Sequence, residues 1–436
     1  MAQFRTDINK IDSGQVFTRY EVNMLSDRLT PSGTMTDAFG RLRVSNPVTL
    51  FDSQHRFQDN GLWATSNTAG NSSYGFVNNQ SMIAMTVGTT ANAEVIRETV
   101  KVFSYQPGKS LLVMSSFAFN EPKANVRQRV GYFSADNGVF LENDGTGNYL
   151  VLRSNTSGTI TDTRVAQTDW NIDKFDGTGY SGQTGRAEHA GGLNVANTNI
   201  LWTDIEWLGV GDVRCGFIVD GKMIPAHTFH NDNVNLVPYM TTASLPLRTS
   251  IKNTGVTASN STMKQICNTV ISEGGYLLYG TQQAVSTPIG TPVTLTTAGT
   301  YYPVLTLRLK TNPNRLDAIV ILTALSILGI TNCFYNWQVR ANAVTAGGTW
   351  VSSGADSAVE YKVGGTVTGG RVLVSGFTAA TNQSSSPIDI LKEALFKFQL
   401  ERNSFTSTPY ELVLAMTAST NNAQVYASMD WEEVTR

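Results

Sequence analysis

The sequence of 436 residues has few charged side chains and no cluster of positive charge. Charged residues make up 15% of the chain, against roughly 25% in an average soluble protein. The formal net charge is -2, and no run of lysine or arginine stands out. Because nucleic-acid binding depends on a basic surface, this composition predicts that the protein does not bind nucleic acid.

Long apolar segments are also missing. The longest apolar run covers residues 318–330 and is interrupted by Thr323 and Ser326, so it is shorter than the roughly 20 residues of a membrane helix. We interpret it as buried strand and predict no membrane insertion. Residues 1–7 are polar and lack the apolar segment of a secretory signal, which predicts a chain that stays in the cytoplasm of its cell until assembly or lysis.

The three cysteines, Cys215, Cys267 and Cys333, are odd in number and widely spaced. This arrangement fits neither a disulfide framework nor a zinc motif. Cysteine packs well as a small apolar residue, so we expect three buried free thiols.

Glycine, by contrast, is abundant, with 38 residues, and serine, threonine and asparagine separate the apolar stretches. Strict alternation occurs in several places, as in Leu305, Leu307 and Leu309, and alternation is typical of half-buried strands. Turn dipeptides such as Asp220-Gly221 lie between such runs. The sequence therefore predicts an all-β fold of antiparallel sandwiches, with a hairpin formed by residues 213–219 and 222–229.

Composition divides the chain into four parts. Residues 1–45 are polar and interrupted by glycine and proline, which predicts an extended arm that docks into neighbouring proteins. Residues 46–280 predict a jelly-roll or concanavalin-like sandwich. Residues 281–300, rich in threonine, proline and glycine, predict a linker, and residues 301–436 a second sandwich. One short helix is expected at Ser386–Glu393, because serine before proline suits a helix start.

Candidate sites for cofactors and metals are weak. The glycines at 177, 179 and 182 have dinucleotide-loop spacing, but no strand precedes them and no helix follows. Asp173 and Asp176 offer oxygen ligands without the full 12-residue calcium loop. His227 and His230 fall on opposite faces of an expected strand, which favours structural or surface roles. We therefore expect no cofactor and no bound metal.

One strand resembles a catalytic strand. Residues 202–209, WTDIEWLG, are similar to the Glu-x-Asp-x-Glu strand of jelly-roll retaining glucanases. The resemblance matches Asp204 to the central aspartate and Glu206 to the acid/base, but Trp202 stands in the place of the nucleophile. Because retaining hydrolysis needs two carboxylates about 5 Å apart, we predict no catalytic residues, and a depolymerase acting through Glu206 remains as an alternative.

The same strand suggests a glycan contact. Trp202 and Trp207 are expected on opposite strand faces, so at least one indole could stack on a sugar ring beside Glu206. The alternative interpretation makes both indoles core or interface anchors. These three residues are the candidate glycan contacts.

Several segments resemble a family of virion structural proteins of tailed bacteriophages, many of which infect cyanobacteria and other marine bacteria. The resemblance rests on residues 36–54, TDAFGRLRVSNPVTLFDSQ, and on the shorter segments WNID at 170–173, DGTG at 176–179, DIEWLGVG at 204–211 and VISEGG at 270–275. It spans residues 36 to about 280 and implies a virion location. Within the arm, Phe39, Arg41 and Arg43 are the expected assembly contacts.

Together these features predict a non-enzymatic building block of a phage particle, in a tail fibre, baseplate or neck. Its partners would be other virion proteins and further copies of the chain, with three-fold symmetry expected, since oligomerisation covers open strand edges. A second hypothesis makes residues 300–436 a receptor- or glycan-binding adhesin for the host surface.

Overall fold

The computed structural model describes residues 46–68, 71–177, 192–274, 280–380 and 399–435. These residues confirm the predicted all-β class: they form antiparallel strands and two short 3-10 turns, Asn78–Gln80 and Gln167–Asp169. Within these ranges, no helix has the length and apolar character required to cross a bilayer. The expected arm, with Phe39, Arg41 and Arg43, and the expected helix at 386–393 lie outside the described residues.

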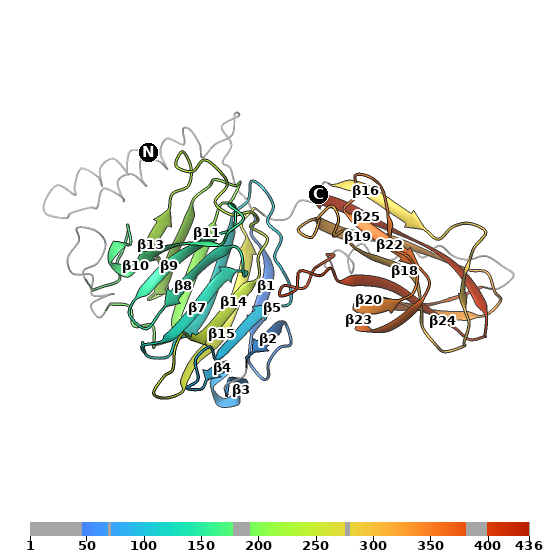
Figure 1. Cartoon of the computed structure of the whole chain (residues 1–436). Coiled ribbons are helices and arrows are strands. Elements are labelled where there is room, and N and C mark those ends of the chain that lie inside the picture. The colour runs from blue at the N-terminus through green and yellow to red at the C-terminus, as the bar shows by residue number, and fades with distance from the viewer. Residues whose placement is uncertain (1–45, 69–70, 178–191, 275–279, 381–398, 436) are drawn as a thin grey trace, which may run out of the picture. The chain divides into compact units, whose positions relative to one another are not determined.

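Two antiparallel sheets form the first sandwich (Figure 1). In spatial order, the first sheet contains β13 (Lys222–Phe229), β12 (Val213–Val219), β11 (Asn199–Ile205), β6 (Leu111–Ala118), β15 (Ser261–Ser272), β4 (Met82–Val87) and β3 (Ser73–Val77), and β1 (Val48–Gln54) also pairs with β15. The second contains β10 (Thr161–Ala166), β9 (Asn148–Ser154), β8 (Gly138–Asn143), β7 (Val126–Phe133), β14 (Leu247–Asn253), β5 (Glu94–Thr99) and β2 (Trp63–Asn67).

The core of the first sandwich follows from the alternation of its strands. In β6, Leu111, Val113, Ser115 and Phe117 are buried, whereas the residues between them are half-buried. Side chains of successive strand residues point to opposite faces of a sheet, so one face of β6 joins the core and the other faces outward.

The predicted hairpin is confirmed. Strands β12 and β13 have the predicted bounds, 213–219 and 222–229, and pair in antiparallel register. The turn residues Asp220 and Gly221 have φ values of 50° and 74°. Two successive positive φ angles give a tight turn whose twist matches that of the strands, which explains why Asp-Gly stands there.

The second sandwich also has two sheets. In one, β25 (Ala423–Thr435) pairs with β16 (Thr281–Ser286), β17 (Val293–Leu295) and β19 (Ile319–Gly329). The other has the order β21 (Val351–Ser352), β22 (Val359–Val363), β18 (Tyr302–Leu309), β24 (Glu411–Ala418), β20 (Phe334–Ala346) and β23 (Thr366–Ala379).

The structure corrects the predicted linker. Strands β16 and β17 lie inside residues 281–300 and belong to the second sandwich. Threonine favours strands as well as loops, and the segment alternates around Val293 and Leu295, both buried. The apolar run at 318–330 is strand β19, as interpreted from the sequence.

The cysteine prediction is right for two residues and wrong for one. Cys215 and Cys333 are buried free thiols, whereas Cys267 is exposed. The reason is a register shift in β15 between Gln265 and Asn268. The inward face changes there from odd-numbered to even-numbered residues, which leaves Cys267 outside.

Candidate functional site

The glucanase-like strand is shorter than its alternation suggests. The sequence predicts that residues 202–209 belong to one strand, but β11 ends at Ile205. The chain then turns through Leu208, with φ 38°, and Gly209, with φ 85°. Trp207 therefore lies in the loop after the strand, and the prediction that both tryptophans share one strand is wrong.

The two indole rings lie in packed surroundings. Trp202 is only 5% exposed, and its Nε1 donates to the carbonyl oxygen of Phe217 at 3.3 Å. Trp207 is half-buried and packs edge-on against Tyr105, with ring centroids 5.6 Å apart. This burial favours the interpretation of both indoles as packing anchors. Glu206 is exposed, and its contact with a glycan stays a prediction.

Asp204 is held by an ion pair. It is buried on β11 opposite Arg214 of β12, and their side chains form a salt bridge. Burial raises the pKa of Asp204, and the positive charge of Arg214 opposes that rise. The ion pair uses Oδ2 of Asp204, and Oδ1 has no hydrogen-bond partner among the described residues.

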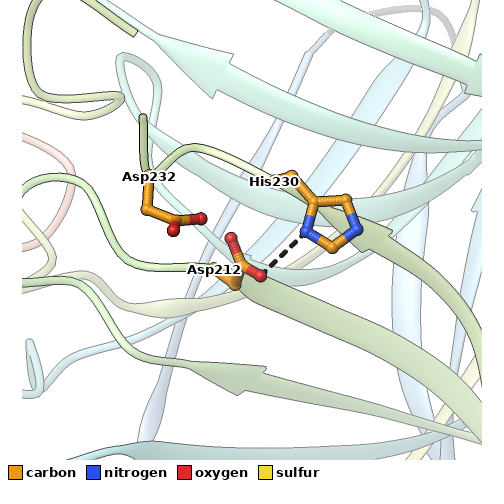
Figure 2. A group of neighbouring side chains, drawn as sticks. All are labelled: Asp212, His230 and Asp232. Atoms are coloured by element: carbon orange, nitrogen blue, oxygen red, sulfur yellow. Dashed lines mark hydrogen bonds and ion pairs between the residues drawn. The ribbon is translucent and has the colours of Figure 1, made fainter. Parts of the chain in front are cut away.

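A second group of polar side chains lies at the open end of the β12–β13 hairpin. Asp212 immediately precedes β12, and His230 and Asp232 follow β13. Figure 2 shows the carboxylates of Asp212 and Asp232 next to the imidazole of His230. One ligand atom from each residue lies within 4.8 Å of the other two. We call these three residues the hairpin-end cluster.

Local hydrogen bonds fix the position of Asp212. Its Oδ2 lies 2.9 Å from Nδ1 of His230, and its Oδ1 accepts the backbone N–H of Asn231 at 3.2 Å. Asn231 donates in turn to the carbonyl oxygen of Gly211 at 2.9 Å. The segment before β12 and the segment after β13 are therefore linked by the side chains of Asp212 and Asn231.

A cavity of about 490 Å³ adjoins this cluster. Its walls come from β9, β10, the end of β13 and the loop at 234–239, and they include His227, His230 and Tyr239. Burial lowers the pKa of His227 to about 4, with a smaller contribution from His230. Its Nδ1 accepts the backbone N–H of Asn171 at 3.3 Å, so His227 is a neutral, packed histidine, in line with the structural role expected for it.

Sequence reasoning missed the hairpin-end cluster because it paired the wrong residues. It compared His227 with His230 along one strand, whereas the partner of His230 is Asp212, 18 positions earlier. The predicted hairpin could have indicated this pair, because the residue before the first strand of a hairpin and the residue after its second strand lie side by side.

Asp173 was considered as a calcium ligand. It is fully buried, and its Oδ1 accepts the backbone N–H of Phe175 at 2.8 Å.

One edge of the second sandwich has no partner among the described strands. Among the described strands, β23 pairs only with β20, and none of its 14 residues is buried. Such an edge leaves a row of backbone N–H and C=O groups available for pairing. Val372, on this strand, is 46% exposed.

Two exposed aromatic rings lie on the outward face of β20 and β23. Phe377 is 82% exposed and lies opposite Asn336, and Phe334, 69% exposed, is two residues from Asn336 on the same face. Next to them, Tyr301 donates to Oδ1 of Asn336 at 2.5 Å and accepts from Nε2 of Gln338 at 2.9 Å. We call this surface the aromatic face.

No family model and no curated protein matches the chain. Solved structures do match in fold. An endo-β-1,4-glucuronan lyase from the fungus Trichoderma reesei is 11% identical, with a TM-score of 0.31, and covers 51% of this chain and 95% of its own. The carbohydrate recognition domain of Emp47p is 12% identical, with a TM-score of 0.33, and the match covers 55% of this chain and 100% of that domain.

A third such structure is the Bacillus licheniformis β-glucanase, 10% identical, with a TM-score of 0.31, over 50% of this chain and 96% of its own. At these identities and scores the likeness concerns the β-sandwich fold and does not extend to function.

Proposed function

We propose that this protein is a non-catalytic structural component of a tailed-bacteriophage particle, in a fibre, baseplate or neck, and that it works by assembly. The observation that carries the proposal is the open edge of β23. Among the described strands, β23 has β20 as its one partner, and a long edge that remains unpaired is a site for adding a strand from another chain. Natural proteins cover such edges, and a symmetric oligomer is a common way to do so.

The contrast with the first sandwich supports this interpretation. Its outermost strands, β13, β3, β10 and β2, have between five and eight residues each. Short edges offer few backbone groups to a partner. Strand β23, with 14 residues, is the longest strand at a sheet edge in the described structure. We therefore expect assembly to use the second sandwich, where the edge offers most backbone groups to a partner.

The phage context comes from the sequence resemblance over residues 36 to about 280. It also supplies the proposed partners: other virion proteins, contacted through the arm with Phe39, Arg41 and Arg43, and copies of the chain itself in a trimer. The particle is the proposed location.

Quantitative mass spectrometry of purified particles of the phage that encodes the chain tests this proposal. Peptides from both sandwiches are expected, in a fixed ratio to the other structural proteins that survives gradient purification and high salt. Particles that lack these peptides, or lose them in high salt, would contradict it.

A second function, glycan binding by the second sandwich, is favoured by the aromatic face. Exposed aromatic rings beside amide groups match the chemistry of a pyranose ring, which has an apolar face and a rim of hydroxyl groups. Phe334 and Phe377 would supply the stacking surface, and Asn336 and Gln338 the hydrogen bonds. Arg340, whose guanidinium lies 4.5 Å from the ring centre of Tyr301, would add a cationic border.

A glycan array probed with the full chain separates this function from assembly alone. Phe334→Ala with Phe377→Ala is expected to reduce retention at least tenfold, whereas Val344→Ala, an exposed residue on the same strand β20, leaves it unchanged. Absence of retention by the natural chain, or equal retention by the double variant, would rule the function out.

A further inference from the structure

The geometry points to a binding site for a divalent transition-metal ion in the hairpin-end cluster, with Asp212, His230 and Asp232 as its protein ligands. The site is independent of the proposed role in assembly. Zinc is the ion that these ligands fit best.

The first argument is the placement of the ligands. The pairing of Val213 with Phe229 fixes the two strand ends from which the cluster extends. Asp212 is anchored further by the N–H of Asn231. A metal ion would therefore meet one ligand already held in place and two ligands, His230 and Asp232, whose exposed side chains can rotate toward it.

The distances leave room for an ion. The three ligand atoms lie within 4.8 Å of one another. In a tetrahedral zinc site the ligand atoms are about 3.3 Å apart, as follows from Zn–N and Zn–O bonds of about 2.0–2.1 Å. Because the side chains of His230 and Asp232 are exposed, rotations about their side-chain bonds can reduce these separations.

The second argument is the cavity beside His230. It has a volume of about 490 Å³, and His230 and Asn231 line part of its wall. Water in this cavity can reach an ion held by His230 and complete its coordination.

The donor set selects the class of ion. Calcium prefers six to eight oxygen ligands, whereas an imidazole with two carboxylates suits zinc and other first-row divalent metals. Three protein ligands leave a fourth position for water. His230 binds only when the coordinating nitrogen carries no proton, so the metal would replace the proton between Nδ1 and Asp212.

Calorimetric titration of the metal-stripped full chain with Zn²⁺ tests the site, with Co²⁺ absorption as a second readout of tetrahedral ligation. One Zn²⁺ per chain is expected. His230→Ala and Asp232→Asn should each weaken binding at least tenfold, because each removes a ligand. Asp220→Asn removes an exposed carboxylate at the other end of the same hairpin and should leave binding unchanged.

Thermal unfolding without metal should give the same midpoint for all three variants, which shows that they fold alike. Two results would overturn the inference: no saturable Zn²⁺ binding by the natural chain, or binding that survives both His230→Ala and Asp232→Asn. Stronger binding of Ca²⁺ than of Zn²⁺ would overturn the assignment of the ion.

Discussion

Trp202 lies directly over Gly216 on the neighbouring strand. A Cβ atom added to Gly216 would lie 2.7 Å from Cζ2 of Trp202 and 2.1 Å from the carbonyl oxygen of Ile224. The indole is therefore buried on β11 because its neighbour on β12 has no side chain. The absence of a side chain at 216 is a packing requirement.

Gly216→Ala is expected to lower the free energy of unfolding by about 1–3 kcal/mol, because the added methyl group must displace an indole and a strand backbone. Urea denaturation measures this loss. Gly75→Ala is the matched control, since Gly75 is also a strand glycine and an added Cβ there meets nothing within 4 Å. Equal stability of the two variants would show that the contact with Trp202 is unimportant.

Arg214→Met is expected to cost about 1–3 kcal/mol at pH 7, because it leaves the buried carboxylate of Asp204 without its cation. Burial already raises the pKa of Asp204, so the loss should shrink at acidic pH as this group takes up a proton. Adding Asp204→Asn should restore part of the stability. If Arg214→Met is neutral at pH 7, the ion pair does not stabilise the fold.

His55 predicts a dependence of stability on pH. Burial and, to a smaller extent, the positive charge of Arg97 lower its pKa to about 4, against the opposing effect of the negative charge of Asp59. In the unfolded chain this histidine takes up a proton near pH 6.5, whereas in the folded chain it does so only near pH 4. The contribution of neutral His55 to the free energy of unfolding is therefore complete above pH 6.5 and is lost as the pH falls toward 4. Urea midpoints at pH 7, 6 and 5 should fall more steeply for the natural chain than for His55→Gln. Parallel curves would contradict the assignment.

The three thiols predict a labelling pattern. Cys267 is exposed, whereas Cys215 and Cys333 are buried. A maleimide should therefore label one thiol in the native chain and three after denaturation. The residue is exposed, but partial desolvation of its sulfur raises the pKa of the Cys267 thiol, so the native reaction should be slow at pH 7 and faster at pH 9. Rapid labelling of two or more thiols under native conditions would contradict this burial pattern.

The fold was largely predictable from local sequence patterns. Alternation in the segment with Leu305, Leu307 and Leu309 predicted strand β18, and Asp220-Gly221 predicted the hairpin with its correct bounds. The failures arose where a local pattern was overridden. The turn after Ile205 interrupts an alternation that continues to Leu208, and the shift in β15 exposes Cys267.

The candidate sites were harder to predict, because they depend on which strands are neighbours. The hairpin-end cluster joins residues that are 18 and 20 positions apart. The aromatic face joins Phe377 to Asn336 across strands that are far apart in sequence. Neither pairing can be derived from alternation within one segment, since alternation assigns a face and does not identify the neighbouring strand.

The mass of the full chain in solution is the most direct test of assembly through the edge of β23. Light scattering should find the 47.3 kDa chain as a trimer. Lysines on an edge strand oppose strand pairing, so Val372→Lys with Ser375→Lys should yield a monomer, whereas Val351→Lys, on the opposite edge of the same sheet, should leave the trimer intact. A natural chain that is monomeric at micromolar concentration, or a double variant with unchanged mass, would contradict the account.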